Sequence, residues 1–271
     1  MPENHAVFAA LREHAREGPA VVAHRGDSEN FAENTLPAFA AALRLGVPMQ
    51  EFDVRSTKDH VLACVHDESF DRTTNAATVL GPGALVAETT HAVALSLDAS
   101  SWHPADRGKA AVPTLAEVLD LLGPRCIAMI EHKAGLPDHY VAEVRRHAAH
   151  TRCIVQSFDW DFVAAVRHAD AAIPLALLGP RSGRPRIDGA AIEFAVTVNA
   201  GMLHWDERAL CYEDVALAHD AGLLVCSYTT DDDLGFLGGA AVGCDAMCTN
   251  RPTRMMQLRR QGWLRRRSPA S

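Results

Sequence analysis

Ionisable side chains stand at the ends of four short apolar segments of this sequence. The segments are VVAHRG, PMQEFDV, VLACVHD and CIAMIEHK, and the side chains are those of His24, Arg25, Glu51, Asp53, His66, Glu131 and Lys133. A short, continuously apolar run is typical of a buried parallel strand. Because an unpartnered charge in such a strand is costly, we expect these residues to be paired or used. Two imidazoles, three carboxylates, an arginine and a lysine at one rim predict a metal-assisted active site.

The three carboxylates favour a hard divalent cation. Glu51 and Asp53 are two residues apart, so both side chains project from one face of a strand, and Glu131 and Lys133 repeat this spacing. Three converging carboxylates cannot all ionise without a compensating charge. Oxygen ligands without cysteine suit Mg²⁺ or Ca²⁺. A structural salt bridge with Arg55 or Lys133 explains Glu51 or Asp53 alone equally well, but the set of three favours the metal.

Two histidines are candidates for proton transfer. His24 and His66 end different strands, and an unperturbed imidazole titrates near pH ~6.5. Such a pair can divide proton removal and donation at neutral pH, and the sequence leaves open which residue does which. Arg25 can fork onto two oxygens of a phosphate, whereas Lys133 acts as a point charge. Two cations and a metal that face one cavity predict an anionic substrate.

The elements that must position these residues alternate between apolar runs and helical patterns, which is the signature of a parallel sheet or barrel. The 271 residues fit a single (β/α)8 barrel, which typically needs about 250. A helix is predicted over residues 33–46, with Gly46 as its stop. Nine runs qualify as strands, one more than a barrel needs, and we expect the extra one among the last three. Only residues 55–60 separate the second and third runs, which is too short for a helix.

Two segments depart from this repeat. Residues 68–112 are irregular, and we interpret them as an insertion after the third strand that caps the barrel mouth. Residues 254–271 form a basic C-terminal tail, in which the arginines favour a frayed, solvated helix end over an anion- or membrane-binding patch. Neither a linker nor a repeat indicates a second domain, so residues 1–271 are expected to form a single domain.

Composition narrows the class of protein. The net charge of −8 argues against nucleic-acid binding. The sequence has neither the ~20 apolar residues of a membrane span nor the apolar core of a signal peptide. Seven cysteines form no CxxC pair and predict reduced, buried thiols. We therefore expect a cytoplasmic protein whose partner is a small molecule, with no nucleic acid and no integral membrane segment. Its oligomeric state is open.

The sequence resembles the glycerophosphodiester phosphodiesterase family, a group of phospholipase-C-like phosphodiesterase TIM barrels. The segments that carry the resemblance keep the family's order over nearly the whole chain, and they are AHRGDSENFAENTLPAFAAAL, EFDVRSTKD, VHDESFDRTTN, IEHK, QSF and TNRP. The resemblance implies metal-dependent hydrolysis of a glycerophosphodiester to sn-glycerol 3-phosphate and an alcohol. It also implies the residue roles, with His24 and His66 as the acid/base pair, Glu51, Asp53 and Glu131 as metal ligands, and Arg25 and Lys133 as phosphate-binding residues.

Three positions differ from the family's usual pattern. Ala32 replaces the proline of Pro-Glu-Asn-Thr, His60 replaces the glycine of an Asp-Gly turn, and Tyr228 replaces a tryptophan. Tyr228 has an amphipathic ring that can still wall the pocket and contact the substrate. None of these changes removes a reacting group, so the changes at positions 60 and 228 bear on the identity of the substrate.

Two alternative functions stay open at this point. A lysophospholipase D acting on lipid phosphodiesters would need a wide apolar groove under the insertion, for which the candidate residues are Leu80, Leu85, Val86 and Trp102. A barrel that binds a phosphate ligand without turnover is the second alternative. The presence of all five proposed metal and histidine residues argues against it.

Overall fold

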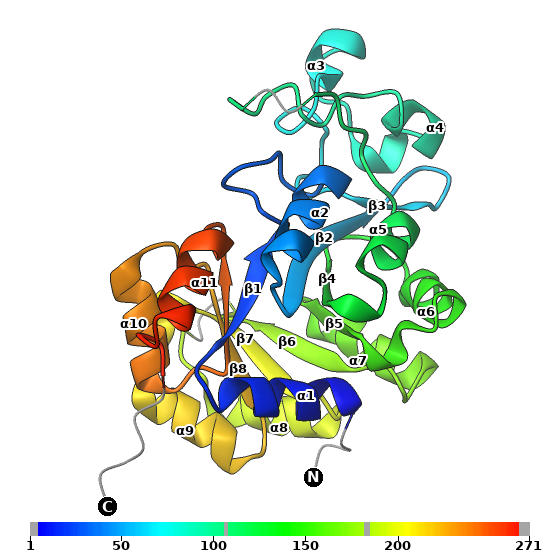
Figure 1. The fold of residues 1–271 in the computed structure, drawn as a ribbon. Helices are drawn as coiled ribbons and strands as arrows, with labels where there is room; N and C mark the ends of the chain where they lie inside the picture. Colours follow the sequence, from blue (N-terminus) through cyan, green and yellow to red (C-terminus); the bar gives the residue numbers. More distant parts are fainter. Residues whose placement is uncertain (1–4, 106–107, 182–184, 266–271) are drawn as a thin grey trace, which may run out of the picture.

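Eight parallel strands close into a barrel in the computed structural model, which describes residues 5–105, 108–181 and 185–265 (Figure 1). The strands follow the order β1-β9-β8-β7-β6-β5-β4-β2, and pairing of β1 with β2 closes the ring. Their bounds are β1 (Ala20–His24), β2 (Met49–Ser56), β4 (Ile127–His132), β5 (Cys153–Ser157), β6 (Leu175–Gly179), β7 (Met202–Asp206), β8 (Leu224–Tyr228) and β9 (Ala246–Thr249). The predicted (β/α)8 TIM barrel is confirmed.

The ninth strand, β3 (Leu62–Cys64), lies outside the ring and pairs antiparallel with β2. The expectation that the extra strand is one of the last three is therefore wrong, because β7, β8 and β9 all belong to the barrel. The physical reason is the short connection before β3. A parallel crossover needs a dozen or more residues, whereas a hairpin needs only a few.

Helices surround the barrel and lie between its strands in the chain order (Figure 1). Those outside the insertion are α1 (Ala6–Ala15), α2 (Leu36–Leu45), α5 (Leu115–Leu122), α6 (Pro137–Arg146), α7 (Trp160–Ala169), α8 (Gly189–Thr197), α9 (Tyr212–Asp220), α10 (Asp233–Val242) and α11 (Pro252–Arg260), with short 3₁₀ turns at Gly123–Arg125, Ala149–Thr151 and Glu207–Ala209. Helix α2 shows how the sequence sets these bounds. The Thr35 hydroxyl accepts a hydrogen bond from the Ala38 amide, and Gly46 ends the helix in the left-handed conformation, as predicted.

The barrel interior changes from apolar to polar along its axis. At the amino ends of the strands, Val22, Met49, Met129 and other buried side chains pack against α1, whose Phe8 is 2% exposed. Further along β2 and β4 the same inward face carries Glu51, Asp53 and Glu131, because side chains two residues apart share a face. The apolar end thus forms the core, and the carboxyl ends of the strands carry the ionisable residues, as in TIM-barrel enzymes.

The segment 68–112 has a small hydrophobic core of its own. Phe70, Ala76, Val86 and Leu97 are buried together in it, and it contains α3 (Ala76–Val79), α4 (His91–Ala94) and a 3₁₀ turn at Val86–Glu88. In Figure 1 it stands at the opposite end of the molecule from α1. Because Val86 is only 1% exposed, it cannot line the apolar groove for which it was a candidate.

The basic segment near the C-terminus is more ordered than expected. Helix α11 buries Met255 and Leu258, and its arginines bind to neighbouring elements, with Arg254 paired to Asp233 on α10. Arg259 donates to the backbone carbonyls of residues 14, 18 and 19. The expectation of a frayed helix end is therefore wrong for residues 254–260, and residues 266–271 of the expected tail lie outside the described residues. Within the described chain, no helix combines the length and apolar character needed to cross a membrane.

Candidate active site

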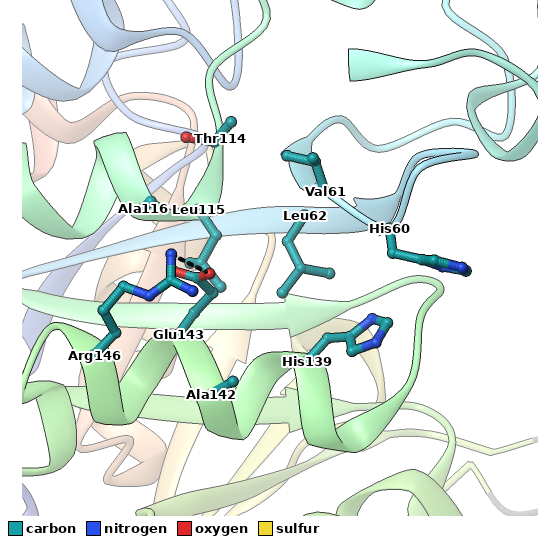
Figure 2. Close-up of a pocket in the computed structure, with 10 residues that line it drawn as sticks. All are labelled: His60, Val61, Leu62, Thr114, Leu115, Ala116, His139, Ala142, Glu143 and Arg146. Carbon is teal, nitrogen blue, oxygen red and sulfur yellow. Dashed lines mark ion pairs between the residues drawn. The ribbon is translucent and has the colours of Figure 1, made fainter.

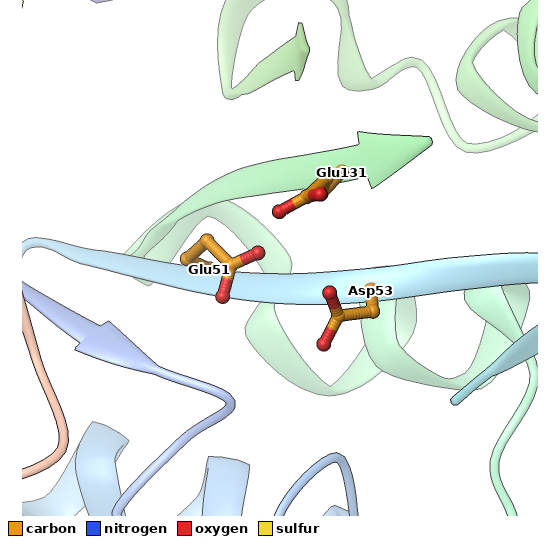
Figure 3. Close-up of side chains that lie close together, drawn as sticks. All are labelled: Glu51, Asp53 and Glu131. Carbon is orange, nitrogen blue, oxygen red and sulfur yellow. The ribbon is translucent and has the colours of Figure 1, made fainter. Parts of the chain in front are cut away.

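Three carboxylates meet inside the barrel mouth. Asp53 on β2 lies directly across from Glu131 on β4, and Glu51 precedes Asp53 on the same face, so the three side chains converge (Figure 3). One carboxylate oxygen from each lies within 4.8 Å of the others, and all three residues are buried. The structure therefore brings together the residues that the spacing placed on one face.

Two cations partly compensate the carboxylates. Arg25 Nε lies 2.9 Å from Asp53 Oδ2, and Lys133 Nζ lies 3.3 Å from Asp53 Oδ1 and also contacts Glu131. The salt-bridge alternative thus holds for Asp53 with Lys133, but Arg55 instead donates to the backbone carbonyl of His66. Two positive charges against three carboxylates leave one negative charge, which argues that the ion pairs alone do not complete the site.

The uncompensated charge falls on Glu51. Both of its carboxylate oxygens are buried and accept no hydrogen bond from any residue that the structure describes. Burial, together with Asp53 and Glu131, raises the pKa of Glu51 well above its ordinary value. Burial and Asp53 also raise the pKa of Glu131, whereas Arg25 and Lys133 outweigh burial and lower the pKa of Asp53. Buried oxygen ligands without donors fit a hard divalent cation such as Mg²⁺ or Ca²⁺.

Glu51→Gln is expected to stabilise the metal-free protein at neutral pH. A carboxyl whose folded-state pKa is raised contributes stability below its ordinary value of 4.5, and that contribution is lost as pH rises. Since glutamine does not titrate, the variant's Tm in EDTA should exceed that of the wild type by several degrees at about pH 8, at roughly 2–4 °C per kcal/mol. The difference should shrink below about pH 4.5. Glu13→Gln, which changes an exposed carboxylate, is the control, and an equal Tm for Glu51→Gln and wild type at both pH values would contradict the assignment.

His24 is held in one orientation by Asn250. Asn250 Nδ2 donates to Asp231 at 2.7 Å, so Asn250 Oδ1 faces His24 Nδ1 as an acceptor at 2.6 Å. His24 Nδ1 therefore carries a proton, and its Nε2 lies 3.7 Å from Glu51 Oε2. Burial and the charge of Arg25 lower the pKa of His24 to about 4. A neutral imidazole with its Nε2 lone pair directed at the carboxylate cluster can accept a proton.

His66 has a different partner. Its Nδ1 lies 2.6 Å from Asp67 Oδ1, and such a carboxylate favours the protonated imidazole. Burial lowers the pKa of His66, while Asp53 and Asp67 act in the opposite direction. Since His66 and Asp53 influence each other's charge, the second histidine lies within electrostatic range of the carboxylates. The pKa of both histidines is lowered overall, with burial as the largest cause, but their Nδ1 partners differ, an amide oxygen for His24 and a carboxylate for His66.

The loop after β1 depends on two unusual backbone conformations. Arg25 and Asn34 have positive φ angles of 59° and 56°, and the Arg25 amide donates to the Glu51 carbonyl. Gly26 follows with φ +83°, and a Cβ there would lie 2.7 Å from the Ala38 carbonyl carbon. Only glycine allows the loop to approach helix α2 so closely. This loop places Arg25 and the Asn34 amide on the Asp53 carboxylate.

Tyr228 lies at the carboxyl end of β8, on the rim. Its hydroxyl donates to the Gly179 carbonyl at 2.6 Å, and its ring stands edge-on to those of Phe158 and His204. Phe158 is 39% exposed. Tyr228 and Phe158 therefore form an aromatic pair beside the mouth.

Sequence reasoning did not assign Glu33, Asp67, Arg72, Asn250 or the contacts they make. All of them occur in the segments that carry the family resemblance, which was the available signal. Two of these contacts, His24 with Asn250 and Arg72 with Glu33, join residues that are distant in sequence, so spacing alone does not reveal them.

A cavity of about 380 Å³ lies apart from this site (Figure 2). It is lined by the turn before β3 and by helices α5 and α6, and His60 and His139 stand at one side of it. His60 has φ +64°, so the residue that replaces the usual glycine keeps a glycine-like backbone. None of the seven charged or imidazole residues singled out at the rim lines this cavity, so the carboxylate cluster, not the cavity, defines the candidate site.

The fold and this rim define the chain as a TIM-barrel enzyme with a cluster of ionisable side chains at the carboxyl ends of its strands. The chain belongs to the glycerophosphoryl diester phosphodiesterase family, whose sequence model matches residues 24–254. It is 32% identical over 252 residues to a glycerophosphodiester phosphodiesterase of Bacillus subtilis, covering 85% of this chain and 83% of that protein.

Two solved structures support the fold. A crystal structure from Silicibacter pomeroyi has a TM-score of 0.87 at 24% identity and covers 97% of this chain and 100% of its own. An Oleispira antarctica phosphodiesterase, solved in complex with the product sn-glycerol-3-phosphate, has a TM-score of 0.79 at 22% identity over 91% of this chain and 98% of its own.

Proposed function

We propose that this protein is a metal-dependent glycerophosphodiester phosphodiesterase that releases sn-glycerol 3-phosphate and an alcohol. The observation that carries the proposal is the buried cluster of Glu51, Asp53 and Glu131, with His24 3.7 Å from Glu51 and His66 within electrostatic range of Asp53. Membership of the family and the product bound to the Oleispira antarctica phosphodiesterase support the same reaction.

Glu51, Asp53 and Glu131 are the proposed ligands of Mg²⁺ or Ca²⁺, which when bound stabilises negative charge on phosphoryl oxygens. Arg25 and Lys133 are the proposed phosphate-binding residues, since both cations already face the cluster. They add positive charge where the transition state concentrates negative charge.

The two histidines are the proposed acid/base pair, and their partners favour one division of roles. His24 is fixed with its proton on Nδ1, so its Nε2 is the proposed acceptor of the proton from the attacking hydroxyl. His66 is supported by Asp67, so it is the proposed donor to the leaving alcohol. The attacking hydroxyl is either that of water or the neighbouring glycerol hydroxyl, through a cyclic phosphate.

The test is a panel of four diesters with and without EDTA. Glycerophosphocholine, glycerophosphoethanolamine, glycerophosphoinositol and a lysophospholipid should be compared by kcat/KM in Mg²⁺ and in Ca²⁺. We expect turnover of the small glycerophosphodiesters. A clear preference for the lysophospholipid would favour the lysophospholipase D alternative, and turnover of none would favour a non-catalytic barrel.

Tyr228→Trp, which restores the residue usual in the family, is expected to change substrate preference without changing the chemistry. The ring lies on the rim but supplies neither a carboxylate nor an imidazole. Ratios of kcat/KM among the four diesters should shift severalfold, because contacts remote from the reacting bond distinguish the alcohol portions. Metal dependence should stay the same. Tyr212→Trp, on an exposed face of α9, is the matched control, and equal proportional effects on all four diesters would show that Tyr228 is only scaffold.

A further inference from the structure

Arg72, near the start of the insertion, lies between two carboxylates of the rim. Its Nε and Nη2 donate to Asp67 at 2.5 and 3.1 Å. Its Nη1 and Nη2 donate to Glu33 at 3.1 and 2.8 Å. Every guanidinium nitrogen is thus used in a double fork, a geometry that a lysine ammonium cannot reproduce.

Each of these carboxylates contacts a residue of the proposed site. Asp67 Oδ1 lies 2.6 Å from His66 Nδ1, the proposed proton donor. Glu33 Oε1 accepts from Arg25 Nη1 at 2.8 Å, and Arg25 is the proposed phosphate-binding residue. Arg72 is therefore linked to His66 through Asp67 and to Arg25 through Glu33.

The positive charge of Arg72 keeps both carboxylates ionised. Its hydrogen bonds, followed by that of His66, lower the pKa of Asp67 despite partial burial. Burial opposes ionisation of Glu33, but Arg72 and Arg25 outweigh it and lower the pKa of Glu33. An ionised Asp67 is what holds His66 with its proton on Nδ1, and an ionised Glu33 is what holds Arg25.

The backbone around Arg72 is fixed by the insertion. The neighbouring Asp71 accepts hydrogen bonds from the Gly83 and Ala84 amides at 2.6 and 3.3 Å. Phe70 and Thr74 on either side are buried, and the Thr74 hydroxyl donates to the Phe70 carbonyl. Asp71 thus binds a later part of the insertion, while the adjacent Arg72 binds the two carboxylates at the rim.

We propose that Arg72 is a positioning residue that couples the folded insertion to the orientation of both His66 and Arg25. This role rests on the proposed phosphodiesterase function. The competing explanation is an ordinary surface ion pair, since the Arg72 side chain is 46% exposed and such pairs contribute little to stability. Both explanations predict that removing Arg72 changes the stability of the fold only slightly. An ordinary surface ion pair predicts unchanged kcat and KM, whereas a positioning residue predicts a loss of catalysis.

Arg72→Ala should lower kcat/KM by about 10- to 100-fold, the usual effect of removing a residue that orients a reacting group. The loss should appear in both kcat and KM. Asp67→Asn should act mainly on kcat through His66, and Glu33→Gln mainly on KM through Arg25. Arg72→Lys should recover little, because it restores the charge but not the double fork.

The deciding measurement is a double-mutant cycle on kcat, using the full chain loaded with Mg²⁺ and glycerophosphocholine as substrate. If Arg72 acts through Asp67, the Arg72→Ala/Asp67→Asn variant should lose hardly more kcat than Arg72→Ala alone. Arg145→Ala on α6, which removes an ion pair with Asp170, should leave kcat and KM unchanged. Asp71→Asn weakens the turn of the insertion but keeps Arg72, Asp67 and Glu33. Comparing it with Arg72→Ala separates the loss of insertion structure from the loss of the Arg72 hydrogen bonds.

Multiplicative losses in the cycle, or full activity of Arg72→Lys, would overturn the proposal. An active wild type with an unaffected Arg72→Ala would refute this role alone. A wild type that hydrolyses no diester would refute the proposed function and this role with it.

Discussion

Replacing His24 or His66 by alanine is expected to lower kcat by about 10²- to 10⁴-fold, the contribution of one general acid or base. His24 lies beside Glu51, His66 lies within electrostatic range of Asp53, and each has a dedicated partner, Asn250 for His24 and Asp67 for His66. The pH–rate profile of the wild type should be bell-shaped, because one histidine must be neutral while the other is protonated. Steady-state kinetics on glycerophosphocholine checks both expectations.

A change of leaving group assigns the two roles. A p-nitrophenyl diester needs no protonation of its leaving group, so it should restore turnover to the variant that lacks the general acid, which we expect to be His66→Ala. His168→Ala, on an exposed position of α7, is the control. Retention of as much as about a third of wild-type kcat in either variant would remove that histidine from the mechanism, and rescue of His24→Ala instead would reverse the assignment.

Removal of divalent cations is expected to abolish diesterase activity. Three buried carboxylates with only Arg25 and Lys133 beside them retain one uncompensated negative charge, and both Glu51 oxygens lack a donor among the described residues. Activity should fall to background in EDTA and return with Mg²⁺ or Ca²⁺. Kinetics over a metal titration, in the wild type and in Glu51→Gln, provide the measurement.

Glu51→Gln should need a higher metal concentration for half-maximal activity, because it replaces a charged ligand by a neutral one of nearly the same shape. Glu13→Gln should match the wild type. Full turnover in protein shown by elemental analysis to be metal-free would contradict the assignment of all three carboxylates.

The barrel could be predicted because its signals are local. Each strand is a short apolar run, and some helices have clear start and stop signals, such as Thr35 and Gly46 around α2. The placement of β3 could not be obtained in the same way, since its apolar run resembles those of the barrel strands. The antiparallel pairing of β3 with β2, which the five residues between the two strands impose, excludes it from the ring. The sequence signal for this pairing was the short gap between the two runs.

The candidate site also has a part that the sequence predicts from local spacing and a part that depends on the tertiary fold. The carboxylates converge because alternation along β2 and β4 places them on one face, which the spacing reveals. The partners that orient the histidines and Arg25 come from loops, and hydrogen bonds such as that between His24 and Asn250 span more than two hundred positions. Loop contacts of this kind follow from the closed barrel, not from any local pattern. The cytoplasmic location expected from cysteine usage stays a prediction.

The most direct test of the proposed function is to follow glycerophosphocholine and the Mg²⁺-loaded wild-type protein by ³¹P NMR, with a choline assay in parallel. The His24→Ala/His66→Ala variant serves as background. The proposed chemistry predicts equal amounts of sn-glycerol 3-phosphate and choline, formed only with the divalent cation and only by the wild type. Phosphocholine as the product would place cleavage on the wrong ester bond, and equal rates in the wild type and the double variant would show that this cluster is not the active site.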